Sequence, residues 1–100
     1  MSVFRPDVLA GQVALVTGGG SGICLGITRK LMAHGSDAVI LSRSQERLDA
    51  AARELEADTG RRCLPIAADV RDAEAVEAAV DQALEALGRL DIVVLSLIHI

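Results

Sequence analysis

A glycine-rich segment, Thr17 to Ile23, follows the short apolar run Val13–Val16 and leads directly into a helical pattern. Glycine lets the chain turn tightly, so that backbone N–H groups approach an anion, and the start of a helix adds a positive dipole. A strand, such a loop and a helix in this order form the cradle of a dinucleotide pyrophosphate. The sequence predicts phosphate binding by Gly18, Gly19, Gly20, Ser21 and Gly22. The alternatives are a tight turn without a ligand and, for Ser21, an ordinary helix N-cap.

Ser42 and Arg43 follow the next predicted strand, Ala38–Leu41, about 20 residues beyond the loop. A site that prefers NAD would place a carboxylate here, to accept a hydrogen bond from the ribose 2′-hydroxyl. A hydroxyl and a guanidinium favour a 2′-phosphate instead, because arginine binds phosphate through paired hydrogen bonds. The pair therefore predicts NADP as the cofactor. The alternative is that Arg43 is a solvated surface residue.

Asp69 comes at the end of the third predicted strand, Cys63–Ala68. At that edge of a sheet its carboxylate can accept from the amino group of adenine, while Val70 packs on the ring. The alternative is a turn residue or a helix N-cap. Arg71 could reach an anionic group of a substrate, although a plain surface role is favoured for it.

Strands and helices alternate along the chain and must position these residues. Strands are predicted over 12–16, 38–41, 63–68 and 91–94, and helices over about 22–34, from Ser44 to Gly60 and from Asp72 to Gly88. This order predicts parallel pairing, right-handed crossovers and the strand order 3-2-1-4, which is the N-terminal half of a Rossmann-type, doubly wound α/β fold. The strands are apolar throughout, as strands buried on both faces should be. The helices carry apolar stripes at Ile23, Ile27, Leu31 and Met32, at Leu48, Ala51, Ala52 and Leu55, and at Val76, Ala79, Val80, Ala83, Leu84 and Leu87.

The composition narrows the class of protein. The chain has 100 residues, a net charge of −4 and a single aromatic residue, Phe4, which argues against nucleic acid or an anionic membrane as a partner. Cys24 and Cys63 lack metal-ligand spacing, so no metal is expected, and they are typical of reduced thiols. No targeting peptide is evident in Met1–Gly11, and the apolar run Leu90–Ile100 is too short for a bilayer. These features predict a cytoplasmic protein.

The motif Thr-Gly-x-x-x-Gly at 17–22, the basic residue after the second strand and the pair Asp69-Val70 together resemble the short-chain dehydrogenase/reductase family. The segments at 4–7, 41–44, 59–65 and 79–84 are similar to the peroxisomal-type 2,4-dienoyl-CoA reductases within it. That resemblance implies an NADPH-dependent enzyme that reduces an acyl-CoA substrate, a homo-oligomer and, as the alternative location, the peroxisome. It also implies NADP contacts from Gly18–Ile23, from Arg43, Ser44 and the residues up to Arg47, and from Asp69, with Arg43 and Arg71 near the CoA part of the substrate.

The chain departs from the family at two places. Cys24 stands where the family loop usually has glycine. After Val94, Leu95–Ile100 replaces the family's Asn-Ala-(Ala/Gly)-Gly turn, and one frame of a transposon-end sequencing adapter translates to that same hexapeptide. We therefore expect 1–94 to be a truncated NADP-binding domain and 95–100 a non-native read-through tail.

Catalytic residues are not expected within this chain. The family's acid is usually tyrosine, and this chain has none, while Lys30 is its only lysine. We expect the chain alone to be inactive. Two other functions fit the same residues: a 3-oxoacyl or alcohol reductase of the same family, and a regulatory module that binds NADP without turnover.

Overall fold

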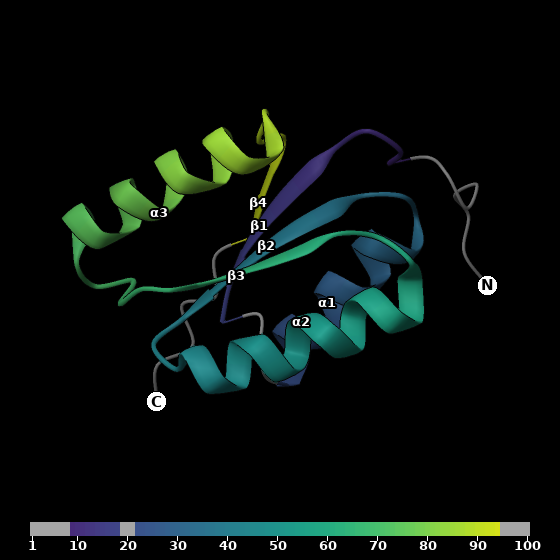
Figure 1. The fold of residues 1–100 in the computed structure, drawn as a ribbon, viewed down its shortest axis with the longest axis horizontal. Helices are drawn as coiled ribbons and strands as arrows, with labels where there is room; N and C mark the ends of the chain where they lie inside the picture. The colour runs from purple at the N-terminus through teal and green to yellow at the C-terminus, as the bar shows by residue number, and fades with distance from the viewer. Residues whose placement is uncertain (1–8, 19–21, 95–100) are drawn as a thin grey trace.

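The computed structural model describes residues 9–18 and 22–94, which form a parallel sheet between two helical layers. Figure 1 shows helix α3 on one face of the sheet and helices α1 and α2 on the other. The elements are β1 (Val13–Thr17), α1 (Gly22–Ala33), β2 (Asp37–Ser42), α2 (Gln45–Thr59), β3 (Cys63–Ala67), α3 (Ala73–Leu87) and β4 (Ile92–Val94).

The strand order is β3-β2-β1-β4, and every pair is parallel, as predicted. The register places Thr17 beside Leu41 and Ser42 beside Ala67, so that β1, β2 and β3 end together at one edge of the sheet. In Figure 1 this carboxyl edge lies toward the left. The residues that follow these strands are therefore brought to the same side of the molecule.

The helix ends agree closely with the sequence. Ser44 caps α2, with its Oγ accepting from the N–H of Arg47 at 3.3 Å, and Asp72 caps α3 by accepting from two first-turn N–H groups at 3.1 and 3.3 Å. Gly60 and Gly88 end these helices with φ of +72° and +82°, a conformation that glycine adopts without a Cβ penalty. These four caps fix where the chain enters and leaves the sheet.

The core is divided between the two faces of the sheet by the alternation of side chains along the strands. Val13 and Leu15 of β1 point into the cluster beneath α3, whereas Ala14 and Val16 point into the cluster beneath α1 and α2. The first cluster continues through Val39, Leu41, Ile66, Ala79 and Ala83, and the second through Cys24, Met32, Ala38, Ile40, Leu48, Ala51, Ala52, Leu55 and Cys63. The stripe predicted for α2 is confirmed in full, because all four of its residues are buried.

Two predicted core positions on the helices are wrong. Ile27 of α1 is 37% exposed and Leu84 of α3 is 41% exposed. The face of α1 that meets the sheet contains Thr28, which is fully buried and donates its hydroxyl to the carbonyl oxygen of Cys24 at 2.7 Å. That bond satisfies the buried hydroxyl, so a polar side chain takes the place that periodicity gave to Ile27.

The outer strands are less buried than predicted. Val93 of β4 is 54% exposed, and Ala67 at the end of β3 is also exposed. Each of these strands has a single strand neighbour within the described part of the chain. Full burial on both faces is confined to the two central strands, β1 and β2.

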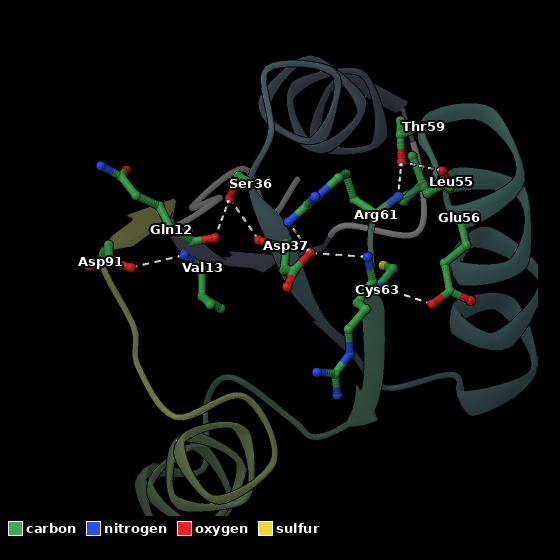
Figure 2. A network of polar contacts seen from close by, with 11 residues as sticks. Gln12, Val13, Ser36, Asp37, Leu55, Glu56, Thr59, Arg61, Cys63 and Asp91 are labelled. Atoms are coloured by element: carbon green, nitrogen blue, oxygen red, sulfur yellow. Dashed lines mark hydrogen bonds and ion pairs between the residues drawn. The ribbon is translucent and has the colours of Figure 1, made fainter. Parts of the chain in front are cut away.

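At the amino ends of the strands, acidic side chains accept hydrogen bonds from backbone N–H groups, as Figure 2 shows. Asp91 accepts from the N–H of Val13 at 2.9 Å, and Glu56 accepts from the N–H of Cys63 at 3.1 Å. Asp37 accepts from the N–H that precedes β3, also at 3.1 Å. These carboxylates therefore satisfy backbone donors at the places where β1 and β3 begin.

Candidate functional site

The carboxyl end of β1 leads into the glycine loop. Gly18 has φ of +68°, a conformation that favours glycine, and its N–H donates to the carbonyl oxygen of Leu41 at 2.6 Å. The loop is therefore anchored to the neighbouring strand at its first residue. Helix α1 begins at Gly22, and its first turn, as the structure describes it, carries no acidic residue. A positive helix dipole whose first turn holds no acidic residue favours the binding of an anion.

The carboxyl end of β2 carries the predicted 2′-phosphate residues. Ser42 is half-buried, and its Oγ accepts from the N–H of Ser44 at 3.3 Å, which leaves its own hydroxyl proton to donate. Arg43 and Arg47 are exposed. Since Arg47 lies in the first turn of α2, both guanidinium groups belong to the segment that leaves the sheet here. This segment can offer donors to an anion but places no carboxylate directly after the strand.

The carboxyl end of β3 carries Asp69, whose carboxylate is held by Arg71. Oδ1 accepts from the backbone N–H of Arg71 at 2.9 Å and from its Nε at 3.1 Å, and Oδ2 accepts from Nη2 at 3.0 Å. The side-chain hydrogen bonds from Arg71 are the largest cause that lowers the pKa of Asp69 to about 2. The backbone bond and the positive charges of Arg71 and Arg43 act in the same direction. Asp69 is thus ionised near neutral pH, and the pKa of Arg71 is raised in return.

Gln45 was missed by sequence reasoning. Its Oε1 accepts from the N–H of Ala67 at 3.3 Å, and its Nε2 donates to Asp49 at 2.8 Å. This side chain ties the start of α2 to the end of β3. A second tie runs from the N–H of Ala68 to the carbonyl oxygen of Ser42 at 2.8 Å. Neither contact has a signal in the sequence, because both join residues more than 20 positions apart through the fold.

The structure brings some of the predicted site residues together, and others lie outside the described residues. Ser42, Arg43, Asp69 and Val70 lie where neighbouring strands end, and Arg71 lies against Asp69. Gly19, Gly20 and Ser21 lie outside the described residues, as do 95–100. Cys24 and Cys63 are buried members of the core. Within 9–18 and 22–94, no three histidine, cysteine or acidic side chains are grouped closely enough to hold a metal ion. The helices described here are all too short or too polar to cross a bilayer.

Comparisons with known proteins agree with this geometry. Residues 12–96 match the family described as short chain dehydrogenase. The peroxisomal 2,4-dienoyl-CoA reductase of Danio rerio is 53% identical over 92 residues, which are 92% of this chain and 31% of that protein. The L-sorbose reductase from Gluconobacter frateurii, complexed with NADPH and L-sorbose, is similar with a TM-score of 0.83 and 36% identity, over 89% of this chain and 34% of that one. NAD+-bound xylitol dehydrogenase is similar with a TM-score of 0.82 and 29% identity, over 86% of this chain and 33% of that one.

These matches cover similar shares of the proteins compared. The chain spans about a third of the length of the relatives it matches. The glycine loop after β1 and the polar residues after β2 and β3 lie inside the matched segment. The chain belongs to the short-chain dehydrogenase family and contains its NAD(P)-binding N-terminal region.

Proposed function

We propose that this region binds NADP in preference to NAD and serves an NADPH-dependent oxidoreductase. The observation that carries the proposal is the pair of residues after β2. Ser42 keeps a hydroxyl proton to donate and Arg43 is exposed beside it, at the position where NAD sites carry a carboxylate. A guanidinium there attracts a 2′-phosphate and offers it paired hydrogen bonds.

The donor groups at the carboxyl edge fit the adenosine half of the cofactor. The loop from Gly18 to Ile23 would hold the diphosphate, and the positive φ of Gly18 already turns the chain there. Ser42, Arg43, Ser44 and Arg47 would surround the 2′-phosphate. Asp69 would accept from the adenine amino group, with Val70, which is half-buried, against the ring. When bound, NADPH supplies a hydride, and the role of these residues is to hold and orient it.

The substrate that we propose is a 2,4-dienoyl thioester of coenzyme A, with activity in the peroxisome rather than the cytoplasm. The support is the 53% identity to the zebrafish peroxisomal 2,4-dienoyl-CoA reductase over 92% of this chain. Arg43 and Arg71 carry the positive charge that the phosphates of CoA would meet at this edge. Since this chain has no tyrosine, we assign the acid of the reaction to the part of the enzyme that lies beyond the matched segment.

The test is an assay of the protein encoded by the longest intact reading frame that contains this chain. With NADPH and a 2,4-dienoyl-CoA, the absorbance of the reduced nicotinamide should fall, and NADH should be a poorer donor. A 3-oxoacyl-CoA and a simple ketone serve as comparison substrates. Turnover of those substrates alone would contradict the dienoyl-CoA proposal and leave the cofactor proposal standing. Binding of NADP without turnover of any of the three would indicate a regulatory module.

A further inference from the structure

The carboxylate of Asp69 is held by one residue, and that residue is its neighbour in the same turn. Its three contacts from the described residues all come from Arg71: the backbone N–H, Nε and Nη2, at 2.9, 3.1 and 3.0 Å. The two side-chain bonds use two different nitrogens on two different oxygens. A bidentate pair of this kind fixes the plane of the carboxylate as well as its position.

A second pair of the same chemistry lies at the opposite edge of the sheet. Arg89 donates Nε and Nη2 to the two oxygens of Asp91, at 2.8 and 2.7 Å. Asp91 also accepts from the N–H of Val13, so that pair joins the start of β4 to the start of β1. The pair of Asp69 and Arg71 does not join two strands in this way, because its three bonds stay within one turn. Its effect is to orient the carboxylate itself.

An ionised carboxylate has about four acceptor positions. Among the described residues, Arg71 alone donates to the Asp69 carboxylate and fills three of these positions, which leaves one for a single further N–H donor. The 6-amino group of adenine requires one acceptor. A carboxylate with a fixed plane and one open position can distinguish this amino group from a carbonyl oxygen, which would meet the carboxylate with repulsion. A freely rotating carboxylate distinguishes the two less well.

We propose that Arg71 is a positioning residue that orients Asp69 as the acceptor for the 6-amino group of adenine and thereby sets the preference for adenine over hypoxanthine. The inference rests on the proposed NADP site. This role concerns the binding of the cofactor, and it is separate from the contact with CoA proposed above for the same residue.

The experiment uses the 100-residue chain and three ligands: NADP+, NAD+, and the hypoxanthine analogue of NADP+, which has a carbonyl oxygen in place of the 6-amino group. NAD+ tests the NADP site itself, and the other two test the adenine preference. Calorimetric titration gives the ratio of the dissociation constants of NADP+ and its hypoxanthine analogue. A charged hydrogen bond predicts a preference of roughly 10- to 150-fold for NADP+ in the parent. Arg71→Ala should reduce that preference by about 5-fold or more, and Arg71→Lys should restore only part of it, since lysine offers a single point charge. Partial unfolding would weaken the binding of both ligands by the same factor, so its effect would cancel in the ratio.

Arg89→Ala is the matched control, because it removes a bidentate arginine–aspartate pair at the other edge and should leave the ratio at the parent value. If Arg71→Ala also leaves the ratio at the parent value while the parent still prefers NADP+ to NAD+, the positioning role is wrong and the NADP site stands. That outcome would also be obtained if Arg71 only contacted the substrate. A parent chain that binds none of these dinucleotides would overturn both the inference and the NADP site.

Discussion

Replacing Arg43 with alanine should weaken the binding of NADP+ by roughly 10- to 150-fold and leave the binding of NAD+ nearly unchanged. The reason is that a charge-assisted bond to the 2′-phosphate is worth about 1.5–3 kcal/mol, and NAD+ has no such group. Arg43 is exposed and is not part of the core, so the variant should fold as the parent does. Calorimetric titration of both dinucleotides into both proteins measures the effect.

Two further variants sharpen this test. Ser42→Asp should lower NADP+ affinity further than Arg43→Ala, because a carboxylate repels the phosphate, and it should raise NAD+ affinity by accepting from the ribose hydroxyl. Arg53→Ala is the matched control, since Arg53 is another exposed arginine, farther along α2. Equal loss for both cofactors in Arg43→Ala would show that Arg43 contacts the diphosphate or the fold. No loss for either would show that it is a solvated residue and would remove the main support for NADP.

The free energy of unfolding should fall as the pH rises from about 9 toward 12, by up to about 1.4 kcal/mol per pH unit. Burial raises the pKa of Cys63 from 9.0 to about 12, and the nearby charge of Glu56 adds to the shift. Below pH 9 both the folded and the unfolded chain keep the thiol proton. Between the two pKa values the unfolded chain loses that proton while the folded chain holds it, so a higher pH favours unfolding.

The composition makes this alkaline effect easy to isolate. The chain has no tyrosine, and Lys30 is its only lysine, so few other groups titrate in this range. Urea unfolding under reducing conditions at several pH values gives the slope. Cys63→Ala should flatten it, and Cys24→Ala, which removes the other buried thiol, should retain it. A slope that survives in Cys63→Ala would show that another group causes it.

Most of the fold could be predicted from the sequence because local signals and tertiary structure agree in it. The helix ends at Ser44, Gly60, Asp72 and Gly88 are predictable from the sequence, and each of these residues makes the local bond or has the backbone angle that its type favours. The strand order followed from the alternation of strands and helices. The strand boundaries moved by at most one residue, because strand ends are fixed by pairing with neighbours rather than by their own sequence.

The remaining features depend on contacts that periodicity does not encode. Thr28 replaces Ile27 in the core because a bond to the preceding turn satisfies its hydroxyl, which an apolar stripe cannot reveal. The positions of Ser42, Arg43 and Asp69 at one edge were predictable from topology. The pairing of Arg71 with Asp69 was not, because side chains two residues apart meet in this way only when the turn between them has the right shape.

Chemical-shift mapping of backbone amides during titration with NADP+ tests the central claim most directly, namely that the carboxyl edge of this sheet is the cofactor site. The signals of Gly18, Arg43, Asp69 and Val70 should move and saturate together. The amides of Val13 and Cys63 lie at the amino edge and donate to the carboxylates shown in Figure 2, and their signals should not shift. Shifts confined to the amino edge, or none at millimolar NADP+, would contradict the claim.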